Sequence, residues 1–156
     1  MRLRASILSW FIFLLALIRL SAGCTADSCL EETTSTVNAT FYKTGSTQAS
    51  IADSLTVFGI GKETDKIYDK ALKVSLIKLP LDASAAGCGF VMKINDVTDT
   101  LRFTYSSYSH LISKECGVTY FFILDSYRVS GTTVDTVIIR NNNITTFNEE
   151  NIRIFY

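Results

Sequence analysis

Short apolar runs alternate with polar, glycine or asparagine positions along most of the chain after residue 30. In the segment TVNATFYK, the side chains of Val37, Ala39 and Phe41 fall on one face and the residues between them on the other, which is the period of two expected of a β-strand. Many short strands with regularly spaced turn signals are typical of an all-β sandwich or barrel. We therefore expect one all-β domain, an antiparallel β-sandwich of the Ig-like or Greek-key type.

Two neighbouring segments carry finer predictions. Residues 62–70 are mixed in charge and predict a solvated connection, and residues 66–73 are the only candidate for a short helix. In residues 72–82 the apolar alternation changes phase at Ile77, which predicts a β-bulge. Pro80 has no N–H to donate, so it is expected to end that ladder.

The second half of the chain predicts a hairpin and a buried strand. Residues 89–105 read as two strands joined by a turn at Asn95–Asp99, which is rich in turn-forming residues. Residues 117–124 are apolar at odd-numbered and at even-numbered positions, as expected of a central strand covered on both faces.

The first 23 residues have the parts of an export signal. Basic residues near the start precede an apolar run over residues 7–18, and small residues at 21–23 lead to Cys24. The apolar run is shorter than the roughly 20 residues that cross a bilayer, so we expect the leader to be removed.

Removal of the leader changes the charge balance. Three of the 15 basic residues lie in the leader, whereas all 15 acidic residues follow it, so the remaining chain carries a net charge of about −3. It has no basic block or stripe, and nucleic acid is therefore not expected as a partner. The single tryptophan, Trp10, is also removed with the leader.

The chain has four cysteines, and oxidised pairs are expected among them, because disulfides persist outside the cytosol. Cys24 directly follows the small residues of the leader. It is either a lipid attachment point, which leaves three cysteines and at most one disulfide within the chain, or half of a disulfide.

Candidate catalytic and metal-binding residues are few. His110 is the only histidine, and no glycine-flanked serine turn accompanies it. Cys24 and Cys29 have no second cysteine pair or nearby histidine to complete a zinc site, and no acidic segment has the spacing of a calcium loop. We expect no catalytic residue, no metal and no cofactor. A hydrolase with a site assembled from loops is the least favoured alternative.

Several short motifs occur in a recognisable order: GCTADSC, DSLTVFGIG, LPLD, DTLRFTY, SKECG, DTVIIRNNNIT and NIRIFY. Together they resemble a family of small lipoproteins of Bacteroidetes with a domain of unknown function. The resemblance implies an acylated Cys24 and a disulfide between Cys29 and Cys116, with Cys88 as the odd thiol. A bridge between Cys29 and Cys88 is the alternative. No activity comes with the family.

The resemblance also implies a division of the chain. Residues 1–23 would be a lipoprotein signal peptide, residues 24–32 an acylated tether and residues 33–156 the β-sandwich domain. Acyl chains would hold the protein at the outer membrane, and an envelope protein or glycan would be its partner. Asp27 alone follows the cysteine where surface export in this phylum favours an acidic cluster, so the periplasmic face is favoured over the cell surface.

A second export route stays open. Small residues at both Ser21 and Gly23 also suit an ordinary signal peptidase. The alternative is then a soluble periplasmic β-sandwich that binds a ligand or glycan, with Cys24 in a disulfide.

Three triplets place an acid, a hydroxyl residue and an aliphatic residue in sequence: Asp53-Ser54-Leu55, Asp99-Thr100-Leu101 and Asp135-Thr136-Val137. This order is similar to the acceptor motif for O-glycosylation of exported Bacteroidetes proteins. Ser54, Thr100 and Thr136 are therefore candidate glycosylation sites, and ordinary turn chemistry before a strand is the alternative.

Overall fold

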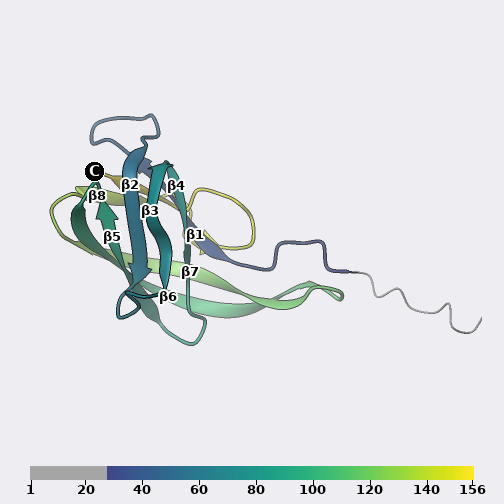
Figure 1. Ribbon diagram of the computed structural model, residues 1–156. Coiled ribbons are helices and arrows are strands. Elements are labelled where there is room, and N and C mark those ends of the chain that lie inside the picture. Colours follow the sequence, from purple (N-terminus) through teal and green to yellow (C-terminus); the bar gives the residue numbers. More distant parts are fainter. Residues whose placement is uncertain (1–27) are drawn as a thin grey trace, which may run out of the picture.

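The computed structural model describes residues 28–156, which form ten β-strands and no helix (Figure 1). Within this range there is accordingly no helix of the length and apolarity needed to cross a membrane. The strands are β1 Thr36–Tyr42, β2 Ala52–Gly59, β3 Lys66–Val74, β4 Leu76–Pro80, β5 Gly87–Ile94, β6 Val97–Ser113, β7 Gly117–Ser130, β8 Thr136–Ile139, β9 Asn143–Ile144 and β10 Ile152–Phe155.

The strands make two sheets that enclose one apolar core. The four-stranded sheet has the order β4-β1-β10-β8, and the six-stranded sheet has the order β3-β2-β5-β6-β7-β9. Fully buried side chains from both sheets form a single cluster, among them Phe41 and Ile154 from the first sheet and Leu55 and Leu101 from the second. The prediction of an all-β sandwich is confirmed.

One strand pair differs from the predicted antiparallel arrangement. β1 lies between β4 and β10, and it runs parallel to β10, with Ala39 opposite Ile152 and Phe41 opposite Ile154. The other strand pairs are antiparallel. No tight turn connects β1 and β10, so the chain connection does not require the two strands to run in opposite directions.

The predicted solvated connection and short helix at residues 62–73 are wrong, because most of this segment is strand β3. β3 is an edge strand that pairs only with β2, and it carries several exposed lysines. Lysine side chains on an edge strand discourage pairing with other chains, which explains a charged strand. Ile67 and Tyr68 pack against the core and hold β3 in place.

The change of phase near Ile77 has a different cause from the predicted bulge. β3 belongs to the six-stranded sheet and β4 to the four-stranded sheet, and the two are separated only by Ser75. The chain therefore crosses from one sheet to the other at this point. At this crossing the core-facing side chains switch between even-numbered and odd-numbered residues, as they do where a strand changes sheets in a sandwich.

The turn of the β5–β6 hairpin is shorter than predicted. Only Asn95 and Asp96 form it, both with positive φ (48° and 74°), as a tight two-residue hairpin turn requires. Residues 97–99 belong to β6, where they pair with the end of β5. Asn and Asp tolerate the left-handed conformation better than other residues with a side chain, so two residues suffice.

Asp99, predicted to lie in this turn, is buried instead, with 1% of its surface exposed. Its carboxylate accepts hydrogen bonds of 2.5–3.3 Å from the backbone N–H groups of residues 132–134. Gly131 precedes them with φ of 143°, and a Cβ there would lie 2.0 Å from Asp99 Oδ1. The loop between β7 and β8 is thus built around one carboxylate.

β7 is not the covered central strand that its composition predicts. Of residues 117–124, only Phe121, Phe122 and Leu124 are buried, and β9 pairs with β7 over only two residues. The end of the β6–β7 hairpin projects beyond the two sheets, alongside the N-terminal segment (Figure 1). We call residues 108–121 of this hairpin the arm.

Candidate functional site

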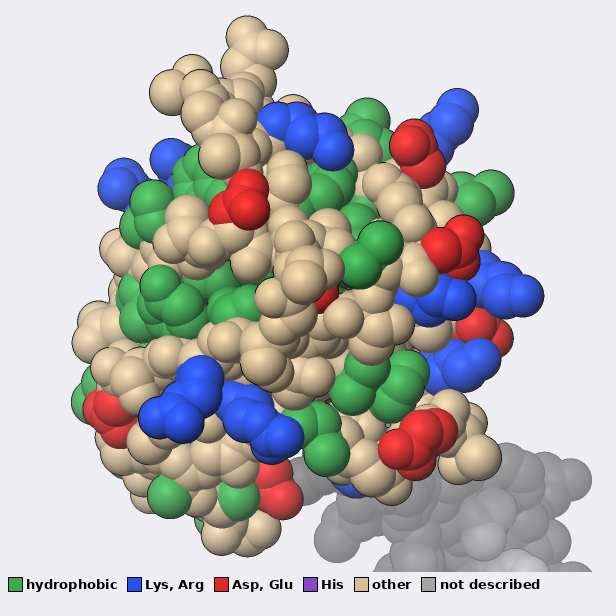
Figure 2. Space-filling model, turned by 90° about the vertical axis from the view of Figure 1, so that its left-hand side faces the viewer, with side chains coloured by type: hydrophobic (Ala, Val, Ile, Leu, Met, Phe, Trp, Pro, Cys, Tyr) green, Lys and Arg blue, Asp and Glu red, His purple; other side chains and the backbone are tan. Residues whose placement is uncertain are grey.

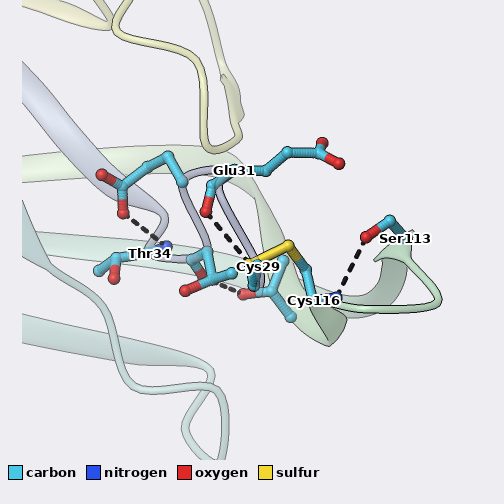
Figure 3. The surroundings of a disulfide bond; sticks show 8 residues. Cys29, Glu31, Thr34, Ser113 and Cys116 are labelled. Carbon is cyan, nitrogen blue, oxygen red and sulfur yellow. Dashed lines mark hydrogen bonds between the residues drawn. A yellow bond between two sulfur atoms is a disulfide. The ribbon is translucent and has the colours of Figure 1, made fainter. Parts of the chain in front are cut away.

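A disulfide joins Cys29 to Cys116, with the two Cα atoms 4.7 Å apart (Figure 3). Cys116 lies in the turn at the tip of the arm, where its backbone N–H donates a 3.1 Å hydrogen bond to Ser113 Oγ. Further along the arm, Thr119 Oγ1 donates to the carbonyl oxygen of Thr33. The segment before β1 is thereby fixed along the arm through the pair that the family resemblance implies.

The other two cysteines are separated from this bridge. Cys88 is a free, half-buried thiol on β5, so the alternative bridge between Cys29 and Cys88 is wrong. Cys24, the predicted lipid attachment point, lies outside the described residues.

The three candidate glycosylation residues lie apart in the fold. Ser54 is half-buried on β2, Thr100 is half-buried on β6, and Thr136 is exposed at the start of β8. The acid of the second triplet, Asp99, has the structural role described above. Glycosylation of these residues stays a prediction.

A cleft of about 980 Å³ opens at one end of the sandwich. It is bounded by the turn after β2, the loop between β4 and β5, the first residues of β5, and the middle of β6 and β7. The face of the molecule in Figure 2 carries basic, acidic and apolar side chains next to one another, without a large area of one charge.

One wall of the cleft is held by a buried tyrosine. The hydroxyl of Tyr105 accepts a hydrogen bond from the backbone N–H of Asp82 and donates one to its carbonyl oxygen, both at 3.0 Å. Ser107 Oγ donates to the carbonyl oxygen of Ala83 at 3.0 Å. These three hydrogen bonds attach the β4–β5 loop to β6, so the wall of the cleft is held in place by the protein itself.

The carboxylate of Asp82 stabilises the conformation of the β4–β5 loop. Asp82 Oδ1 accepts hydrogen bonds from the backbone N–H and the hydroxyl of Ser84, at 2.8 and 2.6 Å. These bonds lower the pKa of the Asp82 carboxyl below its usual value. A carboxylate held in this way stabilises a turn and is a poor general acid at neutral pH.

The thiol in the cleft is also unsuited to catalysis. Partial burial raises the pKa of Cys88, and it raises the pKa of Tyr105 to about 12. Cys88 is therefore protonated at neutral pH, whereas the thiolate is the form that attacks substrates or binds metals.

Two arginines on neighbouring strands line the cleft. Arg102 on β6 lies directly opposite Arg128 on β7, so their side chains leave the same face of the sheet. Among residues 28–156, no carboxylate lies within ion-pair distance of either guanidinium group. Like charges directly opposite each other on a sheet are destabilising, and an anionic ligand would remove that cost.

The floor beside the arginines is glycine. A Cβ at Gly89 would lie 2.5 Å from Ile60 Cδ1 and 3.2 Å from Arg102 Cγ, so both side chains lie directly on the bare backbone. The side chain of Arg102 thus packs on the glycine backbone next to Ile60, which leaves no room for a side chain at residue 89. The pair suits the binding of a carboxylate or phosphate group, since guanidinium matches both in a bidentate geometry.

The remaining candidates for chemistry do not gather at the cleft. His110 stacks on Phe121 in the arm, with ring centroids 4.2 Å apart. No group of three His, Cys, Asp or Glu residues in the described range could hold a metal ion.

The sequence alone did not identify this site. The alternation of apolar and polar residues in the sequence places Arg102 on the outward face of β6. The residue that lies opposite Arg102 on β7 depends on the register of the two strands. A bulge at Asp125 shifts the β6–β7 register just before Arg128. The only signal in the sequence was the pair of glycines around Cys88, which indicates a close approach of other groups to the backbone.

Searches of curated proteins and of solved structures match nothing. A family of unknown function, DUF6452, matches residues 54–156, which is more than half of the chain and runs from β2 to β10. The match begins after β1, although β1 fills the middle of the four-stranded sheet. The chain belongs to the family of unknown function DUF6452.

Proposed function

We propose that this protein is a lipid-anchored, non-enzymatic domain of a bacterial cell envelope, of the kind found in Bacteroidetes. Acyl chains on Cys24 hold it at the outer membrane, with the periplasmic face favoured. The cleft at the end of the sandwich is its recognition surface for an envelope protein or glycan.

The position of the Cys29–Cys116 disulfide carries the first part of this proposal. A fully extended chain reaches at most about 18 Å from Cys24 to Cys29. The Cα of Cys29 lies 4.7 Å from that of Cys116. Cys24 therefore stays within about 23 Å of the tip of the arm.

The remaining thiol is farther away than that. Cys88 lies opposite Phe103, and β6 runs from Phe103 to Ser113 over about 33 Å at roughly 3.3 Å per residue. A disulfide needs Cα atoms within about 7 Å. A bridge between Cys24 and Cys88 would therefore need nearly the full extension of the tether, which favours acylation over the soluble alternative with an intrachain bridge.

Two properties of the cleft support binding without catalysis. Its thiol and its loop carboxylate have pKa values shifted away from catalytic use, since that of Cys88 is raised and that of Asp82 is lowered. The unpaired guanidinium groups of Arg102 and Arg128 suit an anionic group on the partner.

Metabolic labelling with a fatty acid in the native host tests the anchor. We expect label on the wild-type chain and on a Cys88→Ala control, and none on Cys24→Ala. The lipidated chain should also show one free thiol under denaturing conditions. A wild-type chain without label, or without any free thiol, would contradict the anchor.

Capture of envelope components on the purified chain tests the cleft. An Arg102→Gln, Arg128→Gln double variant should lose an anionic partner that the wild type retains. Arg140→Gln, an exposed arginine outside the cleft, is the matched control. Equal capture by all three proteins would show that the cleft is not the recognition surface.

A further inference from the structure

We propose that one face of the arm contacts the bilayer that carries the acyl chains. The inference rests on the anchoring of Cys24 proposed above. We call this surface the apolar face of the arm and define it by Leu111, Val118 and Tyr120.

The register of the hairpin places these three side chains together. Leu111 lies opposite Val118, and Tyr120 lies opposite Ser109 two pairs closer to the sandwich, so all project from the same side. Their exposed fractions are 59%, 62% and 50%. Leu30, next to the disulfide at the tip, is 93% exposed. The described structure thus leaves an apolar surface at the arm without a cover.

The opposite side of the arm is already occupied. Phe121 is buried there beneath the rings of Tyr108 and His110. Thr119, which also projects from that side, bonds to the segment before β1. Tyr108 on that side remains 43% exposed, whereas the three side chains of the apolar face have no cover within residues 28–156, so their occupant must come from outside this range.

The length of the tether indicates the occupant. An acylated Cys24 sits at the bilayer surface, and the tip of the arm cannot move more than about 23 Å from it. Such a short tether holds the apolar face at a high local concentration beside the lipid. A contact too weak to bind a free protein is therefore sufficient, and tyrosine is well suited to the headgroup region.

The charge at the tip limits the chemistry of the contact. Lys114 is accompanied by Glu115, Glu31 and Glu32, so the tip is net acidic. Electrostatic attraction to anionic lipids is thus excluded as the driving force. The surface that fits is the boundary between headgroups and acyl chains of a neutral bilayer.

The contact would lie far from the cleft. Arg102 and Cys88 line the cleft near the base of the hairpin, about 33 Å along β6 from its tip by the rise of a strand. The bilayer contact and the cleft would therefore use different parts of the molecule.

Tryptophan fluorescence can test this directly, because Trp10 is the only tryptophan and is removed with the leader. Leu111→Trp places a probe on the apolar face, and Leu72→Trp places one on β3, where leucine is 73% exposed. Each lipidated chain is inserted into phosphatidylcholine vesicles with brominated acyl chains. We expect about half of the Leu111→Trp emission to be quenched, and less than about a tenth for Leu72→Trp.

Further variants assign the quenching to the apolar face. Adding Val118→Ser and Tyr120→Ser to Leu111→Trp should lower the quenching at least twofold, with unchanged thermal unfolding. Equal quenching of the two single variants would overturn the inference. A blue shift that depends on protein concentration without vesicles would also overturn it, because a second copy would then be the occupant.

Acylation of Cys24 and the contact of the arm with the bilayer are tested by different measurements. Mass spectrometry of the chain reports whether Cys24 is acylated, independently of fluorescence. If it is not, the same variants are attached to chelating lipid through a histidine tag that replaces the residues before Thr25. Quenching on these vesicles would support the arm contact alone, and its absence would overturn it.

Discussion

The two ends of the β6–β7 hairpin belong to the same pair of hydrogen-bonded strands but are stabilised by different interactions. At the base, Leu101 is fully buried in the core between the sheets. Near the tip of the same strand, Leu111 is 59% exposed. The base is stabilised by burial and by the Asp99 carboxylate, and the arm by a disulfide and the segment that lies along it.

This difference shows which part of the hairpin is required for the fold. Burial of apolar area is the main source of folding free energy, so the base belongs to the cooperative unit. The arm buries little on one face, and a covalent bond joins its tip to the segment before β1. We expect the base to resist local unfolding, and the conformation of the arm to depend on the groups that contact it.

The strongest test is the same substitution at both ends. Leu101→Ala removes a fully buried side chain and should lower the free energy of unfolding by about 3 to 5 kcal/mol. Leu111→Ala should change it by about 0.5 kcal/mol or less. Denaturant titration of both variants measures the difference. Similar losses would mean that the arm is part of the core.

The second test removes the carboxylate at the base. Asp99→Ala leaves the backbone N–H groups of residues 132–134 without their acceptor, which should cost roughly 2 to 4 kcal/mol. Asp125, exposed at the bulge of β7, provides the control, and Asp125→Ala should be nearly neutral. If the two variants had the same denaturation midpoint, the β7–β8 loop would not depend on Asp99.

The third test opens the disulfide at the tip. Cys29 and Cys116 are 87 residues apart, for which the chain-entropy model gives a ceiling of roughly 4 to 5 kcal/mol. A double Cys→Ser variant should lose less, about 1 to 3 kcal/mol, because its unfolded state is not a random chain. Hydrogen exchange should become faster in the arm and remain slow at the base. Faster exchange at both ends would show that the disulfide also stabilises the base, and that the two ends are not stabilised independently.

The smallest effect is expected away from the hairpin. Glu150 accepts hydrogen bonds from Tyr42 and Arg153, at 2.9 and 2.8 Å. Partial burial alone would raise the pKa of Glu150, but these two hydrogen bonds outweigh it and the pKa is lowered.

The pH dependence follows from this direction. A lowered pKa in the folded state contributes stability above the ordinary value of 4.5, and that contribution is lost as the pH falls through the folded pKa. Glu150→Gln should therefore flatten the decrease in stability below about pH 4.5 and leave the arm unchanged. An unaltered pH profile of the melting temperature would show that this carboxyl does not contribute.

The fold class could be predicted because alternation is a local property. Val37, Ala39 and Phe41 show the period of two in the sequence, and all three are fully buried in β1. β3 was missed because an edge strand needs little apolar surface. The role of Asp99 was missed because the backbone donors that it binds lie more than 30 residues later in the chain.

The cleft and the apolar face of the arm were missed for a related reason. Arg102 and Arg128 become neighbours only through the β6–β7 register, which includes a bulge. Val118 and Tyr120 appear in the sequence as part of a buried strand, since apolar residues at both parities are the usual sign of one. Nothing local indicates that the hairpin continues past the sheet that would cover them.

The parallel pairing of β1 with β10 has a consequence for the order of folding. β1 is separated from β10 by more than 100 residues, and β10 connects it to β8 in the four-stranded sheet. Contacts of such long range make folding slow, because the intervening chain must be closed before they form. A chain that crosses a membrane from its N-terminal end could not complete this sheet until Ile152–Phe155 had also crossed. If the chain is exported as proposed, slow closure of this sheet would thus keep it unfolded during the crossing.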